Sequence, residues 1–319
     1  MLATRYELLD KIGNGAFGEV HRAKALRSGD VCAVKRLRVN DDGQLAVVPA
    51  AHSTDTVNAD LQIVKLLDVM PDGSHIALVL EYMPTDLHSV RSCSLQAAVL
   101  VPKLSLICVA VQILRHRDEP FEAADVRGLL RMLLHGDLKP GNLLLSAEGV
   151  LKLSDFGLAT VFVGRTGRSY SHQVATRWYR APELLFGARQ YDAAVDMWAV
   201  GAIFAELLRL TPLFPGQNDL DQLFRVIQVL GDIEKQWPGV RELPDYNKVR
   251  FPAYDPMPLS KLFPDAEKSA VDLLSKLLAL DPSKRLSAQQ VGKMAALGGL
   301  DGCLTAHLPG LLSPSLAAA

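Results

Sequence analysis

The stretch "MLLHGDLKPGNLLLS", residues 132–146, carries three side chains of catalytic chemistry, Asp137, Lys139 and Asn142. A further aspartate, Asp155, follows eighteen residues after Asp137 in "SDFGLA". Phosphoryl transfer needs one carboxylate to orient the attacking hydroxyl, and an asparagine with a second carboxylate to hold Mg²⁺ across the phosphates. The spacing therefore predicts Asp137 and Lys139 as catalytic residues, and Asn142 and Asp155 as metal ligands.

A glycine-rich segment near the N-terminus fits the same chemistry. "GNGAFGEV" places Gly13, Gly15 and Gly18 in G-x-G-x-x-G spacing, and a strand-like run, "EVHRAKAL", follows. Because a dinucleotide fold would open a helix there, the pattern favours a strand-turn-strand hairpin over phosphates. Lys35, seventeen residues after Gly18, would point its ammonium at those phosphates. A turn without function and a solvated lysine are the alternatives, and the joint occurrence of the motifs argues against both.

The periodicity of apolar residues divides the chain into two parts. The first forty residues alternate as strands do, and "HIALVLEYM" (75–83) is a further strand-like run. From about residue 120, apolar residues recur at three- and four-residue spacing, as in "AAVDMWAVGAIFAELLRL" and "KSAVDLLSKLLAL". We therefore predict an α+β fold in which a small antiparallel β-rich lobe precedes a larger, mainly helical lobe.

The amino-acid composition limits the classes of partner that the chain could bind. Lys and Arg number 34 against 35 Asp and Glu, so no net field favours nucleic acid or an anionic membrane. The cysteines show no paired spacing, which favours reduced intracellular thiols over a zinc site or disulfides: Cys32, Cys93, Cys108 and Cys303. The N-terminus lacks the apolar run of a secretion signal. The apolar segment 95–114 contains Lys103, whose cost at mid-bilayer is about 2.5–3.5 kcal/mol, so we expect no membrane partner.

Longer segments carry a family resemblance. "ATRWYRAPE" places Glu183 twenty-eight residues beyond Asp155, and residues 150–287 and 5–38 resemble protein kinases of the cyclin-dependent kinase group, above all its cell-cycle-related kinases. The resemblance implies a two-lobed kinase fold, ATP with Mg²⁺ as cofactors, and protein serine or threonine substrates followed by proline. It also implies residence in the cytoplasm, nucleus or cilium and a role in the cell cycle.

The resemblance also implies roles for individual residues. Leu80 resembles the gatekeeper, Arg177 fits the substrate-proline pocket, and Asp196 and Trp198 resemble the helix that braces the catalytic loop. Arg285 resembles the arginine that pairs with Glu183, and Ser171 is the candidate phosphosite. The nucleotide would contact a larger set, which adds hinge and ribose positions to the motifs above: Ile12, Gly13, Asn14, Gly15, Ala16, Phe17, Gly18, Val20, Ala33, Lys35, Glu81, Met83, Asp86, Lys139, Asn142, Leu144 and Asp155.

The chain departs from the family pattern in its regulatory parts. No glutamate occurs between Glu19 and Glu81, so the usual partner of the Lys35-type lysine is missing, and a cyclin or other activator of the N-terminal lobe is in doubt. Gly136 and Thr160 stand where the family has arginines that grip an activating phosphate, and no arginine occurs from 39 to 90. We therefore expect phosphorylation of Ser171 to activate little.

Segment lengths depart as well. About a dozen residues that the family has before the catalytic loop are absent at Leu134, which predicts a truncated helix there. Residues 44–62 are atypical for the family, and residues 91–112 resemble an insertion. Both segments end in Gln, and one Gln codon matches the sequence with which introns commonly end. We therefore interpret both segments as retained intron sequence. We predict domains at 1–84 (N-lobe, with a disrupted helix), 85–296 (C-lobe) and 297–319 (flexible tail).

Three interpretations remain open from the sequence. The first is an active serine/threonine kinase, since the catalytic and metal residues are all present. The second is a catalytically impaired pseudokinase or binding module, which the missing glutamate and Gly136 favour. The third is a nonproductive splice product, because a helix shortened by three turns would leave core positions empty.

Overall fold

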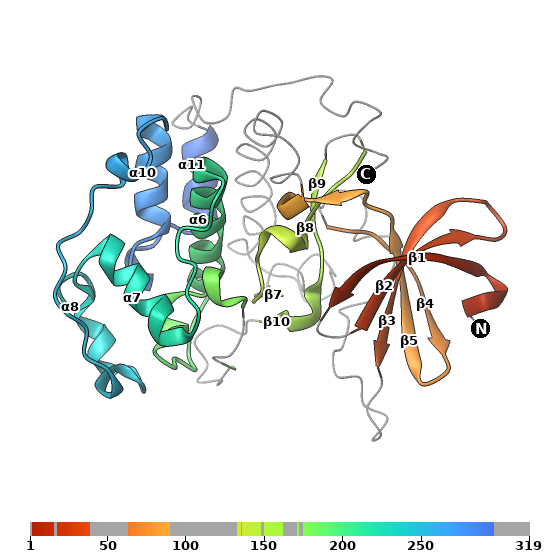
Figure 1. The fold of residues 1–319 in the computed structure, drawn as a ribbon, viewed down its shortest axis with the longest axis horizontal. Helices are drawn as coiled ribbons and strands as arrows, with labels where there is room; N and C mark the ends of the chain where they lie inside the picture. The colour runs from red at the N-terminus through yellow and green to blue at the C-terminus, as the bar shows by residue number, and fades with distance from the viewer. Residues whose placement is uncertain are drawn as a thin grey trace.

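The computed structural model has two lobes, a β-sheet lobe and a helical lobe (Figure 1). It describes residues 2–15, 18–38, 63–89, 133–134, 136–147, 150–161, 171 and 175–296. The predicted α+β, two-lobed arrangement is confirmed: the described strands of the N-lobe form an antiparallel sheet, and most described helices lie in the C-lobe.

The N-lobe is a five-stranded antiparallel sheet in the order β1-β2-β3-β5-β4. A 3₁₀ turn, η1 (Leu2–Thr4), leads into strands β1 (Tyr6–Gly15), β2 (Gly18–Ala25), β3 (Val31–Arg38), β4 (Leu66–Asp72) and β5 (His75–Glu81). The sequence pattern did not single out β4, whose "LLDVMPD" contains Pro71. Proline is tolerated there because β4 is an edge strand.

Alternation along β3 places Lys35 on the face opposite the N-lobe core. Cys32 and Val34 pack with Ala23 and Val79 in a buried cluster. Because successive side chains of a strand point to opposite faces, Lys35 lies on the other one. It pairs with Val20 of β2, two residues after Gly18, where the second strand of the glycine-rich hairpin begins. The sheet thus carries the lysine and the glycines on neighbouring strands.

The third glycine of the motif is required by packing. Gly18 has φ +154°, and a Cβ built there would lie 1.7 Å from the backbone oxygen of Arg36 on β3. No side chain fits that distance, so only glycine allows β2 to start so close to β3. Ala16 and Phe17, which lie between β1 and β2 in sequence, are outside the described residues.

The C-lobe is built around one long buried helix, α6 (Ala194–Arg209). Further helices among the described residues of this lobe are α5 (Pro182–Leu185), α7 (Asp219–Leu230), α8 (Ile233–Gln236), α9 (Leu259–Leu262), α10 (Lys268–Leu277) and α11 (Ala288–Ala296). Short 3₁₀ turns join them at η5 (Arg177–Tyr179), η6 (Pro238–Glu242), η7 (Tyr246–Lys248) and η8 (Pro282–Lys284). The main core cluster centres on α6, so elements that contact it are held firmly.

Small sheets lie between the lobes. Strands β6 (Thr85–Asp86), β8 (Leu143–Leu145) and β9 (Leu151–Leu153) form one sheet in the order β6-β8-β9, and β7 (Leu133–Leu134) pairs with β10 (Thr160–Val161). The 3₁₀ turns η3 (Pro140–Asn142) and η4 (Phe156–Leu158) adjoin β8 and β9. The motifs of the predicted site therefore lie at the junction of the lobes.

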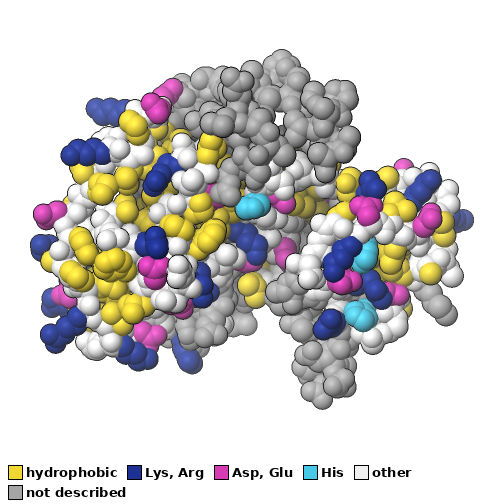
Figure 2. All heavy atoms as spheres, in the orientation of Figure 1, with side chains coloured by type: hydrophobic (Ala, Val, Ile, Leu, Met, Phe, Trp, Pro, Cys, Tyr) yellow, Lys and Arg dark blue, Asp and Glu magenta, His cyan; other side chains and the backbone are white. Residues whose placement is uncertain are grey.

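Several sequence predictions fall outside the described residues. These are the disrupted helix and the atypical segment 44–62, the insertion 91–112, and the tail 297–319. The predicted truncated helix also lies outside them except at its end, where the prediction is wrong: Leu133 and Leu134 form the strand β7, because they pair with β10. Among the described residues, no helix is long and apolar enough to cross a membrane. On the face drawn in Figure 2, side chains of both signs are interspersed over the two lobes, as the balanced composition suggests.

Candidate active site

One hairpin brings the two predicted metal ligands together. Strands β8 and β9 are antiparallel, with Leu143 opposite Leu153, so their outer neighbours Asn142 and Ser154 lie side by side. Ser154 donates from its backbone N and from its hydroxyl to the carbonyl oxygen of Asn142, at 2.8 and 3.0 Å. Asp155, the next residue, is thereby held beside Asn142. Asn142 and Asp155 are thirteen residues apart in sequence, which is the length of chain that this hairpin and its flanking residues take up.

Four donors fix the carboxylate of Asp137. Its Oδ1 accepts hydrogen bonds from the backbone N (2.8 Å) and the hydroxyl (2.9 Å) of Thr176. Its Oδ2 accepts from Lys139 Nζ at 2.7 Å and from Asn142 Nδ2 at 3.3 Å. The predicted base is therefore buried and fixed in orientation.

Asn142 is oriented by the same loop. Its amide Nδ2 donates to the backbone oxygen of Asp137 at 2.9 Å, which leaves the amide oxygen as the atom suited to a cation. The side chain is buried, so its rotamer is fixed by packing as well. The structure brings Asp137, Lys139 and Asn142 together, as the sequence predicts.

Gly136 adopts a backbone conformation that suits glycine. Its φ is +72°, and a Cβ there would lie 3.1 Å from the backbone oxygen of Leu158. Its backbone N donates to Oδ1 of Asp196, a buried aspartate of α6, at 3.1 Å. The departure from the family pattern at this position therefore relieves backbone strain, while α6 still holds the loop from below.

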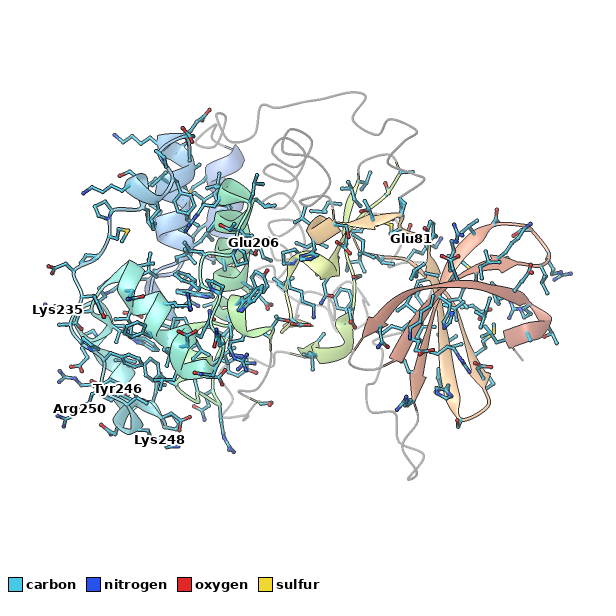
Figure 3. All side chains as sticks on the ribbon, in the orientation of Figure 1. Glu81, Glu206, Lys235, Tyr246, Lys248 and Arg250 are labelled. Carbon is cyan, nitrogen blue, oxygen red and sulfur yellow. The ribbon has the colours of Figure 1, made fainter. Side chains whose placement is uncertain are left out.

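Buried contacts at the base of the C-lobe support this arrangement. Arg285 binds Glu183 with two hydrogen bonds of 2.8 and 3.1 Å, donates to the backbone oxygen of Ala194 at 2.7 Å, and lies over the ring of Trp198 at 5.1 Å. Tyr179 donates to Glu206, labelled on α6 in Figure 3, at 2.7 Å. The segment from Thr176 to Glu183 is thus anchored to the buried helix.

Lys35 reaches the site from the N-lobe. Its Nζ lies 2.6 Å from Asp155 Oδ1, which also accepts from the backbone N of Gly157 at 3.3 Å. Asp155 has φ +56°, in the left-handed region, which turns its side chain back toward its own backbone. The lysine and the predicted metal ligand are therefore directly paired across the lobes.

The predicted hinge carries a second contact between the lobes. Glu81, labelled at the end of β5 in Figure 3, accepts from Lys152 Nζ of β9 at 2.6 and 2.8 Å and from the backbone N of Lys65 at 2.6 Å. Both its side chain and its backbone N, which donates to the backbone oxygen of Lys65 at 2.9 Å, are thus held by contacts within the protein. Met83, two residues after Glu81, is buried. The side chain of Asp86 accepts a hydrogen bond from the backbone N of Ser89 at 2.6 Å.

The remaining predicted contact residues line the sheets around this junction. Ala33 of β3 pairs with Leu80 of β5, and Leu144 of β8 pairs with Asp86 of β6. Ala33 is buried, whereas Ile12 at the glycine-rich hairpin is 42% exposed. Their roles in nucleotide contact stay predictions.

Sequence reasoning missed one arginine and one threonine. Arg177 donates to Asp219 at 2.8 Å and to the backbone oxygen of Gln217 at 3.1 Å. It is Arg180 that donates to the backbone oxygen of Ala175, at 2.9 Å. The run "ATRWYRAPE" contains these residues, but it does not tell which arginine turns inward or that Thr176 contacts Asp137.

The candidate phosphosite lies at the edge of the described activation segment. Ser171 is exposed, and its backbone oxygen accepts from the hydroxyl of Tyr191 at 2.6 Å. Gly136 and Thr160 offer no guanidinium at the positions where the family has one. The structure therefore shows that Tyr191 holds the backbone of Ser171, and the effect of phosphorylating Ser171 on activity stays a prediction.

The donor set fits ATP with Mg²⁺. An asparagine and an aspartate side by side supply the oxygen ligands that Mg²⁺ prefers, and such sites need only one or two protein ligands because the phosphates supply others. Within the described ranges, no group of three or more His, Cys, Asp and Glu could hold a metal ion by protein ligands alone. The ammonium groups of Lys35 and Lys139 suit phosphate oxygens.

Comparisons with known proteins agree with this geometry. The family model described as "Protein kinase domain" matches residues 6–295. Cyclin-dependent kinase 20 of Danio rerio is 42% identical over 302 residues, covering 90% of this chain and 81% of the relative. Cyclin-dependent kinase 20 of Homo sapiens is 40% identical over 302 residues, with the same coverage. Cyclin-dependent kinase D-1 of Arabidopsis thaliana is 37% identical over 308 residues, covering 92% of this chain and 71% of the relative.

Proposed function

The chain belongs to the protein kinase family, within its cyclin-dependent kinase group, and from that premise we propose that it is itself an active kinase. It would transfer the γ-phosphoryl group of ATP to a serine or threonine hydroxyl of a protein. One observation carries the proposal: Asp137, Lys139 and Asn142 are joined by hydrogen bonds of 2.7 to 3.3 Å in one loop, although the sequence around them departs from the family.

Each residue has a distinct task in this mechanism. Asp137 accepts the hydrogen bond of the substrate hydroxyl and orients its oxygen for attack, and Lys139, bound to Asp137, brings its ammonium to the transferring group. Asn142 and Asp155 would hold Mg²⁺, which neutralises phosphate charge when bound. Lys35 would contact the phosphates from the N-lobe. The positions of all five follow from β3, the loop and the β8–β9 hairpin.

A phosphate-transfer assay tests the proposal. The full chain, incubated with labelled ATP, Mg²⁺ and a Ser-Pro peptide, should incorporate label, and Asp137→Asn should reduce turnover by about 100-fold or more. Asp272→Asn, at an exposed carboxylate of α10 that binds Lys276, is the matched control and should keep wild-type turnover. Equal incorporation by wild type and Asp137→Asn would contradict phosphoryl transfer at this site.

We further propose that the kinase is proline-directed. Ala175 lies directly before Thr176, which contacts Asp137, so the substrate residue after the phosphoacceptor passes near it. The carbonyl of Ala175 is occupied by Arg180 at 2.9 Å. A backbone N–H of the substrate would lose this acceptor, whereas proline has no N–H to satisfy. A Ser-Pro peptide should therefore be phosphorylated faster than its Ser-Ala counterpart, and equal rates would contradict this preference.

A second candidate function is a nucleotide-binding module with impaired catalysis. The pairing of Lys35 with Asp155 at 2.6 Å favours it, because the lysine and Mg²⁺ then share one carboxylate. Thermal unfolding with and without ATP and Mg²⁺ separates the two candidates. Stabilisation without label transfer selects the binding module, and stabilisation with transfer selects the kinase.

For partners and location we propose protein substrates in the cytoplasm or nucleus, with the cilium as a further site and the cell cycle as the process. The relatives are named cyclin-dependent kinases, and the missing glutamate argues against the same dependence here. Co-purification of the tagged chain from dividing cells, with imaging of the same tag, tests both points. A cyclin in stoichiometric amounts would contradict cyclin independence.

A further inference from the structure

The outer flank of helix α7 carries apolar side chains that the core does not cover. The face of the helix toward the core consists of four buried residues, Gln222, Leu223, Val226 and Ile227. Leu220, in the first turn, is 50% exposed, and Phe224 is partly exposed. Because residues four apart lie on the same face of a helix, Leu220 and Phe224 form one apolar row. In Figure 2, hydrophobic side chains gather on the part of the C-lobe surface where Figure 1 places α7.

The segment that follows residue 253 extends this apolar row. The rings of Phe224 and Tyr254 meet edge to face, with their centroids 5.9 Å apart. The backbone oxygen of Tyr254 accepts from the backbone N of Asp232 at 3.0 Å, and the exposed Met257 donates from its backbone N to the backbone oxygen of Val229 at 2.9 Å. Contiguous apolar surface of fixed geometry marks an interaction site, unlike single exposed side chains. We call four residues the α7 stripe: Leu220, Phe224, Tyr254 and Met257.

The helix that carries the α7 stripe is fixed to the activation segment. The exposed Trp178 donates from its indole N to the backbone oxygen of Gly216 at 3.1 Å. Gln222, which is completely buried, accepts from the backbone N of Gly216 at 3.0 Å and donates to the backbone oxygen of Trp178 at 3.4 Å. A buried side chain of α7 therefore holds the start of this helix and the activation segment together.

A protein substrate at Asp137 comes within reach of the α7 stripe. Thr176 donates to Asp137 at 2.8 Å, and the next residue, Arg177, binds Asp219 at 2.8 Å. Asp219 directly precedes Leu220. The path along these bonds and side chains from Asp137 to Leu220 is roughly 25 Å long, which about eight residues of extended chain can span. A substrate whose hydroxyl lies at Asp137 can therefore contact the stripe with a neighbouring segment.

We propose that the α7 stripe docks an apolar segment of the protein substrate, at a distance from the phosphoacceptor. The inference rests on the proposed function, because continuity with the phosphoacceptor site is what selects a substrate over other apolar partners. The docked segment would be an amphipathic helix that presents leucine- or phenylalanine-like side chains four residues apart, which matches the spacing of Leu220 and Phe224. Contact at this second point raises the local concentration of the hydroxyl at Asp137 and so strengthens substrate binding.

Binding of fluorescent peptides to the full chain tests this without requiring turnover. A short Ser-Pro peptide is compared with two extended peptides, in which a Gly-Ser linker joins an amphipathic helix with Leu and Phe four residues apart to one end or the other. A linker of about fifteen residues has a root-mean-square length of about 19–23 Å, which suits the path. With Mg²⁺ and a non-hydrolysable ATP analogue, we expect one extended peptide to bind about tenfold more tightly than the short one, a ratio that we call the docking gain. Replacing its Leu and Phe by Gln should abolish the gain.

Matched variants locate the docking surface. Leu220→Glu should reduce the docking gain at least about fivefold, because the apolar segment would have to cover a charge. Leu26→Glu changes a leucine of similar exposure, 55%, that directly follows β2 in the N-lobe, and it should keep the gain. A general loss of structure would weaken the short and the extended peptides alike, and melting curves of both variants report whether they are folded.

The outcomes distinguish this inference from the proposed function. Equal binding of short and extended peptides by wild type overturns the inference, and so does a docking gain in Leu220→Glu that stays within about twofold of wild type. Self-association of the chain that Leu220→Glu abolishes, with no gain for either extended peptide, assigns the stripe to a second copy and overturns the inference as well. A gain that depends on Leu220, in a chain that transfers no label, supports the docking surface and contradicts the kinase activity alone.

Discussion

The base of the C-lobe and the junction of the lobes hold the same site in different ways. At the base, Arg285 and Glu183 are almost completely buried and make several contacts with α6 and its neighbours. At the junction, Lys35–Asp155 and Glu81–Lys152 are pairs whose side chains are 11–26% exposed, and they join elements far apart in sequence. The base thus fixes the catalytic loop within one packed core, whereas the junction joins two lobes through a few charges.

Because of this difference, we expect the base to determine the positions of the catalytic residues and the junction to determine nucleotide binding. Asp137 and Asn142 are joined to the base through Gly136 and Asp196. Lys35 depends on the orientation of the lobes. Changes at the base should therefore affect stability of the whole C-lobe, and changes at the junction should affect binding of ATP.

Arg285→Met should have the largest effect. It leaves Glu183 as a buried charge without its guanidinium, at a cost of about 3–5 kcal/mol in the free energy of unfolding. Urea unfolding measures it. The matched control is Arg225→Met, which breaks the partly exposed pair with Asp221 and should cost at most about 0.5 kcal/mol. Similar costs for the two variants would mean that burial does not distinguish the base.

Lys35→Met tests the junction. Loss of the ammonium should weaken ATP binding about tenfold or more, because a hydrogen bond to a charged group contributes roughly 1.5–3 kcal/mol. The thermal shift on adding ATP and Mg²⁺ measures it, and Lys24→Met, at an exposed lysine of β2, is the control. An unchanged shift in Lys35→Met would show that the N-lobe lysine takes no part.

Gly136→Ala should have a smaller effect, on the loop that connects the two regions. A methyl group at φ +72° costs about 1–2 kcal/mol and meets the backbone oxygen of Leu158. Unfolding in urea should show this loss. Gly141→Ala, in the same loop with nothing within 4 Å of its added Cβ, should cost less than half as much. Equal costs would contradict the role of backbone strain.

Ser171→Glu should have the smallest effect. Since the guanidinium groups that would grip a charge are replaced at Gly136 and Thr160, turnover should change less than about twofold. Label transfer to the Ser-Pro peptide measures it, with Ser171→Ala as the neutral control. A tenfold rise in the glutamate variant would show that another part of the chain supplies the missing cations.

The fold and the core of the site could be predicted because their signals are local. Alternation placed Lys35 on a strand, and the thirteen residues from Asn142 to Asp155 are the length that the β8–β9 hairpin takes up. The strand β4 was missed because Pro71 and its aspartates mask an edge strand. Contacts such as Arg180 with Ala175, or Glu81 with Lys152, join distant segments, and nothing in either segment alone specifies the partner.

Gly136 illustrates a second limit. The sequence shows only that Gly136 stands where the family has an arginine, because a motif specifies residue types and not backbone conformation. The structure adds the φ of +72° and the bond to Asp196, which show that the loop's backbone keeps its support. A substitution that removes a regulatory contact can therefore be favourable for the conformation of the loop that carries it.

The contacts between lobes also have a mechanical consequence. Lys152 binds Glu81, the backbone oxygen of Leu153 accepts a hydrogen bond from the backbone N of Val64, and Asp155 binds Lys35. Three residues of β9 and of the segment directly after it therefore contact the N-lobe. Rotation of the lobes must pull on this short segment, whose end is a predicted metal ligand. Movement of the lobes relative to each other and the geometry of the metal site are therefore coupled through this segment.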